Sequence, residues 1–113
     1  MILAPSNLYF DDVEVGLSKI VSFVIKNLNA TDVHITGIVS DNSKFTVTPL
    51  TKTITPGNEE TFSVTYLPTV ATLDFGTLTV SSDDIDLPLS IAGLNGTGII
   101  ANIVVTPSSL DFG

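Results

Sequence analysis

The strongest constraint on the fold is the alternation of apolar and polar residues in short segments along the whole chain. It is clearest in residues 61–66, TFSVTY, where Phe62, Val64 and Tyr66 fall on one face of an extended strand and hydroxyl side chains fall on the other. Residues 77–81, TLTVS, repeat the pattern, and helical spacing is not sustained anywhere. The alternation therefore predicts half-buried antiparallel β-strands.

Similar apolar sets recur about every ten residues, separated by turn-forming residues, which predicts an all-β sandwich or barrel of seven to eight antiparallel strands. The sets are Leu8 and Phe10; Val13 and Val15; Val21, Phe23 and Ile25; Val33 and Ile35; Phe45 and Val47; Phe62, Val64 and Tyr66; Leu78 and Val80; and Leu87, Leu89 and Ile91. The predicted turns include Asp11-Asp12, residues 27–31, residues 55–58, Asp83-Asp84 and the glycine-rich residues 93–98. Because Pro88 has no N–H group, we expect the last strand to be only partly paired.

The two ends of the chain resemble each other. Residues 5–10, PSNLYF, and residues 107–112, PSSLDF, are identical at four of six positions with an offset of 102 residues. A chain of 113 residues has room for one hydrophobic core. We therefore predict one sandwich module over residues 1–100, with residues 101–113 as a linker and the truncated first strand of the next repeat.

Charge and composition exclude several classes of partner and cofactor. Twelve acidic residues against four lysines and no arginine give a net charge of −8, which disfavours nucleic acid and anionic lipid. No apolar run is long enough to cross a bilayer, so we predict no membrane insertion by this fragment. The chain has no cysteine, which excludes disulfides and thiolate metal sites. No cofactor is predicted.

Two acidic clusters are weak candidates for a calcium site, because carboxylate oxygens are what Ca²⁺ prefers. They contain Asp11, Asp12 and Glu14 in the first cluster and Asp83, Asp84 and Asp86 in the second. Neither matches the spacing of a helical calcium loop. We predict that both clusters are solvated turns without a bound metal. The alternative is a calcium site formed by both clusters together, which requires that they lie at the same end of the sandwich.

Candidate catalytic and sugar-binding residues are few. His34 is the single histidine and alternates with Val33 and Ile35, which predicts an outward strand position with no marked orienting group for a base. The glycines of residues 93–98 have the wrong order for a dinucleotide fingerprint. Tyr66 shares the inward set, so Tyr9 and Tyr66 do not form a sugar-stacking strip. We predict that the chain is not an enzyme.

An ordered set of short motifs resembles the ASH/Hydin-like immunoglobulin family, which is related to major sperm protein and PapD-like sandwiches. The motifs are Pro5-x-x-Leu8-x-Phe10, Val13-x-Val15-Gly16, Lys26-Asn27, Phe45-x-Val47-x-Pro49, Ile54-x-Pro56-Gly57, Val64-x-Tyr66-x-Pro68, Gly76-x-Leu78, and Ile91 with Gly96-x-Gly98. The resemblance implies an all-β, immunoglobulin-like antiparallel β-sandwich of seven to eight strands over residues 1–100. It also implies a non-catalytic module, found either in tandem repeats of bacterial or archaeal surface proteins or in ciliary and centrosomal targeting scaffolds.

The polar composition without arginine or cysteine favours the first group and an extracellular or cell-surface location. The sequence thus predicts a spacer, stalk or protein-interaction unit whose partners are neighbouring repeats of the same chain and a protein that the sequence does not identify. The alternatives are a calcium- or carbohydrate-binding accessory module, or a targeting scaffold if the chain is eukaryotic.

Overall fold

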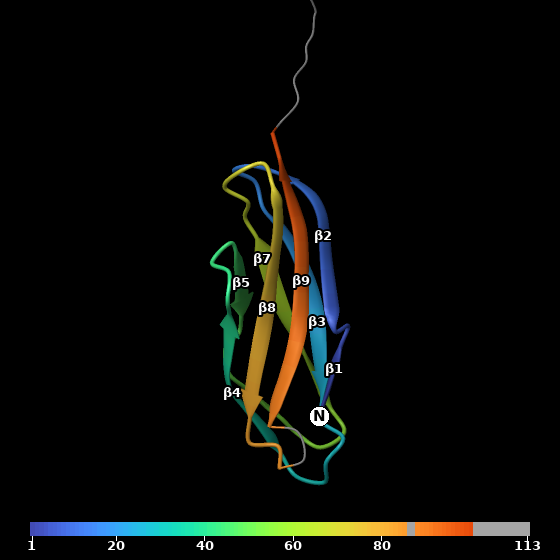
Figure 1. Ribbon diagram of the computed structural model, residues 1–113. Helices are drawn as coiled ribbons and strands as arrows, with labels where there is room; N and C mark the ends of the chain where they lie inside the picture. The colour runs from blue at the N-terminus through green and yellow to red at the C-terminus, as the bar shows by residue number, and fades with distance from the viewer. Residues whose placement is uncertain (86–87, 101–113) are drawn as a thin grey trace, which may run out of the picture.

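The computed structural model describes residues 1–85 and 88–100, and these residues form nine strands in two packed sheets (Figure 1). The four-stranded sheet has the order β1 (Ile2–Ala4), β3 (Lys19–Lys26), β7 (Glu59–Tyr66), β5 (Phe45–Thr48). The five-stranded sheet has the order β2 (Asn7–Glu14), β9 (Leu89–Ile99), β8 (Leu73–Ser82), β4 (Val33–Ser40), β6 (Lys52–Ile54). The predicted all-β, immunoglobulin-like sandwich is confirmed.

The core lies between the two sheets and contains the alternating residues that the sequence pointed to. Phe62, Val64 and Tyr66 on β7 are all 0% exposed. Aromatic rings fill the middle, with Phe45 stacked on Tyr66 at a centroid distance of 4.6 Å and Phe23 stacked on Phe62 at 5.3 Å. Alternation on a central strand therefore identified the buried face correctly.

Turn chemistry at one end of the sandwich is also as predicted. The buried Asn27 side chain donates to the carbonyls of Thr31 and Ile54, both at 2.8 Å, and accepts from the Asn29 N–H at 2.8 Å. Gly57 has φ of 76°, and the Asn58 N–H donates to the Thr55 carbonyl at 3.1 Å. The Pro56-Gly57 pair thus forms a tight turn in which the second central residue needs the left-handed conformation.

The predicted turn at Asp11-Asp12 is wrong, because β2 runs through it. The pairing register with β9 shifts between Tyr9 and Asp12, and Asp11 has φ of 58°. This β-bulge lets Phe10 and Val13 both face the core although they are three residues apart. One bulged strand therefore replaces the two short strands that the pattern suggested.

The prediction for the last strand is wrong in three respects. Residues 93–98 lie inside β9 and form no turn. The inward side chains are Ala92 and Leu94, whereas Leu89 and Ile91 are 56% and 62% exposed. Pro88 precedes the strand, so β9 pairs along both edges, antiparallel with β8 and parallel with β2. Leu87 lies outside the described residues.

Two further differences concern strands. The short edge strands β1 and β6, three residues each, carry too little alternation to be recognised in the sequence. The parallel β2–β9 pair is an exception to the antiparallel pattern. The tetrapeptide LDFG occurs twice in the sequence, at residues 73–76 and 110–113, and its first copy begins β8. Among the described residues no helix is long and apolar enough to cross a membrane.

Candidate functional site

The two acidic clusters lie at opposite ends of the five-stranded sheet. Asp12 pairs with Thr97, which in turn pairs with Leu73 at the start of β8. Asp83 follows Ser82, the last residue of the same ten-residue strand. A strand of that length spans roughly 30 Å, so the two clusters cannot share one metal ion.

Neither cluster forms a site by itself in the part of the chain that the structure describes. Over residues 1–85 and 88–100, no three His, Asp or Glu side chains gather where they could hold a metal. Asp11 faces solvent and lies 3.8 Å from the Lys19 ammonium. Asp84 is buried, and its Oδ2 accepts from the Met1 amino group at 2.5 Å. Asp86 lies outside the described residues.

His34 has an orienting partner that the sequence did not reveal. Its Nδ1 lies 2.7 Å from Asp83 Oδ2, and its backbone N–H donates to Asp83 Oδ1 at 2.7 Å. Both hydrogen bonds from His34 lower the pKa of the Asp83 carboxyl, and the bond from the backbone N–H has the larger effect. Both side chains are about half exposed. The pair joins β4 to the loop after β8, and within residues 1–85 and 88–100 no hydroxyl group is hydrogen-bonded to the imidazole.

A buried polar network lies at one end of the core, where Asp74 joins both sheets. Its Oδ2 accepts from the Tyr66 hydroxyl at 2.5 Å, and its Oδ1 accepts from Lys44 Nζ at 2.9 Å. Tyr66 is 0% exposed and Asp74 is 6% exposed. Burial, the hydrogen bond to Asp74 and the negative charge of that carboxylate raise the pKa of Tyr66. This network fixes the start of β8 against β7.

A glycine makes room for this network. A Cβ atom on Gly96 would lie 2.5 Å from Cε2 of the Tyr66 ring, so only glycine lets β9 pass the tyrosine. A Cβ atom on Gly98 would lie 2.2 Å from the carbonyl oxygen of Val70. Gly96 therefore lets β9 pack closely against Tyr66 on β7, and Gly98 lets it pack closely against the loop that contains Val70. Both glycines serve close packing within a strand and not a turn.

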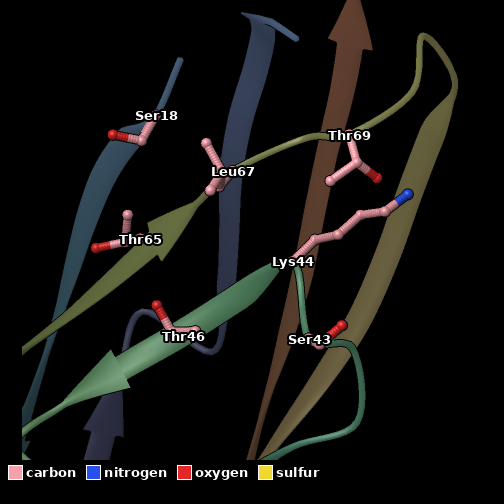
Figure 2. Close-up of a pocket in the computed structure, with 7 residues that line it drawn as sticks. All are labelled: Ser18, Ser43, Lys44, Thr46, Thr65, Leu67 and Thr69. Atoms are coloured by element: carbon pink, nitrogen blue, oxygen red, sulfur yellow. The ribbon is translucent and has the colours of Figure 1, made fainter. Parts of the chain in front are cut away.

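A hollow of about 340 Å³ opens beside the network on the four-stranded sheet, and Figure 2 shows its lining. Thr46 and Thr65 lie opposite each other on β5 and β7, and Lys44 extends away from them toward β8 and Asp74. The remaining lining residues are Ser18, Ser43, Leu67 and Thr69. Since the only cation here is already bound to Asp74, the hollow offers hydroxyl groups and little charge.

Comparison with known proteins identifies the family. Residues 1–87 match the family model described as "Abnormal spindle-like microcephaly-assoc'd, ASPM-SPD-2-Hydin", abbreviated ASH. The chain belongs to the ASH family. No curated protein sequence matches this ASH domain. Family membership confirms the resemblance carried by the short motifs.

Solved structures similar to this ASH domain share its fold. PapD-like domain 7 of human CEP192 superposes with a TM-score of 0.80 at 16% identity, over 89% of this chain and 86% of that one. The MSP-domain-like protein SSP-19 of Caenorhabditis elegans gives 0.63 at 12% identity, over 86% and 99%. The CsuC–CsuE chaperone–tip adhesion subunit complex of Acinetobacter baumannii gives 0.64 at 15% identity, over 86% and 51%. The family and its neighbours support a non-enzymatic β-sandwich module.

Proposed function

We propose that this ASH domain is one module of a tandem-repeat secreted or cell-surface protein, where it works as a spacer and protein-interaction unit. One observation carries the proposal: the chain enters and leaves at opposite ends of the sandwich (Figure 1). β1 starts at the end that holds the Asn27 turn, and β9 finishes at the end that holds the loops after β2 and β7. Modules joined in this way extend into a linear array.

The internal similarity of the sequence supports the same reading. Pro107 stands where the next copy of Pro5 is expected, so Ile103 stands where the next copy of Met1 is expected, which leaves two residues, 101 and 102, between Ile100 and the following module. Two residues span at most roughly 7 Å when fully extended. The next module would therefore lie close to the exit end of this one. Residues 101–113 are outside the described part of the chain, so their assignment to a linker and a first strand belongs to this proposal.

Apolar side chains at the exit end support a contact between successive modules. Leu17, Val70 and Ile100 are 56%, 52% and 66% exposed. Backbone hydrogen bonds hold this end together, since the Val15 N–H donates to the Ile99 carbonyl at 2.8 Å and the Gly98 N–H donates to the Thr72 carbonyl at 2.9 Å. A following module placed by a short linker would cover these side chains and remove their apolar surface from water.

The interaction role is supported by the fold and by an open sheet edge. The chaperone CsuC was solved in a complex with a tip adhesion subunit, so this type of sandwich is compatible with protein binding. Here β5 pairs only with β7 and leaves its other edge unpaired within the described residues. An extended segment of a partner could add to such an edge. The cell-surface location rests on the composition without cysteine or arginine.

A two-copy fusion tests the proposal. Residues 1–106 are followed directly by residues 5–100, so that Pro5 takes the place of Pro107. We expect small-angle X-ray scattering to show an elongated particle with nearly twice the length of the single copy 1–100, and calorimetry to show that both copies fold. A second copy that fails to fold, or two copies packed side by side, would contradict the array.

A further inference from the structure

The two sheets present chemically different outer faces. On the four-stranded sheet, the outward side chains of the central part are mainly hydroxyls: Ser22, Thr46, Thr48, Thr61, Ser63 and Thr65. On the five-stranded sheet, six large apolar side chains point outward and are between 56% and 65% exposed: Tyr9, Val39, Leu73, Phe75, Leu89 and Ile91. We call this second set the apolar face. Exposed apolar side chains gathered on one face of a sheet mark binding surfaces.

Strand register arranges the apolar face in two rows. Asn95 on β9 pairs with Tyr9 on β2 and with Phe75 on β8, and these three form the aromatic row. The aliphatic row contains Thr79 on β8 with its partners Ile91 on β9 and Val39 on β4. Phe75 and Thr79 are four residues apart on β8, so the rows are roughly 13 Å apart along the strands.

The apolar face carries no charge on its two central strands. The outward residues of β8 and β9 are Leu73, Phe75, Thr77, Thr79, Ser81, Leu89, Ile91, Gly93, Asn95, Thr97 and Ile99. None of these is acidic or basic, although the chain has a net charge of −8. The nearest acidic groups lie at its edges: Asp11 is beside the aromatic row, and Asp41 is beside β8, where its Oδ1 accepts from the Thr77 N–H at 2.7 Å. Two copies of this acidic chain can therefore bring β8 and β9 together without placing a carboxylate between these strands.

We propose that the apolar face binds the same face of a second copy of this chain. The two facing five-stranded sheets, one from each copy, are related by a two-fold axis that lies between them and crosses the strands near Thr77 and Gly93. This axis places the aromatic row of each copy on the aliphatic row of the other. Such an interface is self-complementary, as two-fold symmetry requires. It also keeps Asp11 of the two copies at opposite ends of the contact. Asp41, which is level with the axis, meets its counterpart at the β4 edge, where salt screens the two charges. Sheets packed in this way form an aligned sandwich.

The size of the face sets the strength of the contact. Four strands, β2, β9, β8 and β4, and the two rows cover roughly 500 Å² per copy, estimated from the strand spacing and rise. Stable pairwise interfaces bury about 800 Å² per partner. The isolated module should therefore dimerise weakly, with Kd on the order of 0.1–1 mM. In an array, several such contacts between two parallel chains would act together and bind far more tightly. That last step rests on the proposed function, whereas the dimer itself does not.

Sedimentation velocity on the whole chain, from about 0.02 to 2 mM, tests the proposal over the range of the expected Kd. We expect a reversible monomer–dimer equilibrium that Phe75→Ser and Ile91→Ser each weaken at least about tenfold, because each removes apolar surface from one row. Ile20→Ser is the matched control, since Ile20 is 62% exposed like Ile91 but lies on the four-stranded sheet. Added salt should strengthen the dimer by screening the net negative charge.

The melting temperature of each variant should match that of the parent chain, because all three side chains are exposed. A chain that stays monomeric at about 2 mM would overturn the proposal. So would a dimer that Ile20→Ser weakens as much as Ile91→Ser, or one that neither Phe75→Ser nor Ile91→Ser affects. A monomeric single copy together with an elongated two-copy fusion would refute the dimer and leave the array intact.

Discussion

The hydroxyl group of Tyr66 offers the sharpest test of how the core is held together. Tyr66→Phe removes one oxygen atom and keeps the ring that stacks on Phe45 and packs against Gly96. The lost hydrogen bond goes to a buried carboxylate, and bonds to charged groups contribute about 1.5–3 kcal/mol. We therefore expect the free energy of unfolding to fall by about 2 kcal/mol, or roughly 10 °C in Tm. Tyr9→Phe is the matched control, because Tyr9 is 63% exposed and its hydroxyl has no hydrogen bond within the described residues.

The same tyrosine predicts a pH dependence with a definite sign. Burial and Asp74 raise the pKa of Tyr66 in the folded state, so the neutral phenol is favoured there. Its contribution to stability is complete below pH about 10 and declines as the pH rises further, because the unfolded chain loses the phenolic proton first. At pH 11 the difference in unfolding free energy between the parent chain and Tyr66→Phe should be smaller than at pH 7 by about 1 kcal/mol.

Urea denaturation of the parent, Tyr66→Phe and Tyr9→Phe at pH 7 and pH 11 measures both effects. Tyr9→Phe should follow the parent at pH 7. If Tyr66→Phe cost no more than Tyr9→Phe at pH 7, the hydroxyl would not stabilise the fold through Asp74. If its difference from the parent did not shrink at pH 11, the phenol would not be held neutral in the core.

Four further outcomes are expected. Gly96→Ala should lower the free energy of unfolding by about 1–3 kcal/mol in thermal denaturation, because the new methyl group meets the buried tyrosine ring. Gly37→Ala is the control and should have little effect, because a Cβ atom there has nothing within 4 Å. Equal effects of the two changes would contradict the packing role of Gly96. Phe62→Ala should cost about 3–5 kcal/mol, and Ser63→Ala, on the outer face of the same strand, less than about 0.5 kcal/mol. Deleting residues 101–113 should leave Tm nearly unchanged, since the described core closes without them, and unfolding of the shortened chain would move the domain boundary. Millimolar calcium should not shift Tm, and stabilisation by several degrees that a chelator reverses would restore the acidic clusters as a site.

The buried face of a strand could be predicted from the sequence wherever the opposite face is polar. On β7 hydroxyls alternate with Phe62 and Val64, so the buried face was unambiguous. On β9 both faces are apolar, with Ile91 outside and Ala92 and Leu94 inside. Period-two alternation cannot orient such a strand, and a slip of one residue reverses every side chain. The exposed apolar face that led to the dimer proposal is thus the same feature that misled the sequence interpretation.

Hydrogen-bonded pairs of polar residues far apart in the chain could not be predicted, because no pattern in the neighbouring sequence indicates the partner. His34 and Asp83 are 49 residues apart and meet only because β4 pairs with β8. Asp74 follows an apolar residue and precedes another, so its inward position depends on partners supplied by Tyr66 and Lys44. A carboxylate between Leu73 and Phe75 would be placed outward by hydrophobicity alone. Here the hydrogen bonds outweigh that preference and turn the two apolar side chains toward solvent.

The tetrapeptide LDFG shows that the surroundings of a segment decide which of its side chains are buried. In residues 73–76 the structure places Asp74 inward, with Leu73 and Phe75 each 63% exposed. In residues 110–113 the same letters align with Leu8, Tyr9 and Phe10, of which Leu8 and Phe10 are buried and Tyr9 is exposed. Under the proposed repeat, Asp111 takes the position of Tyr9, so the following module carries a carboxylate where this module has an aromatic of the apolar face. A module with that substitution lacks part of the aromatic row, and we expect it to bind its own kind less well than the module described here.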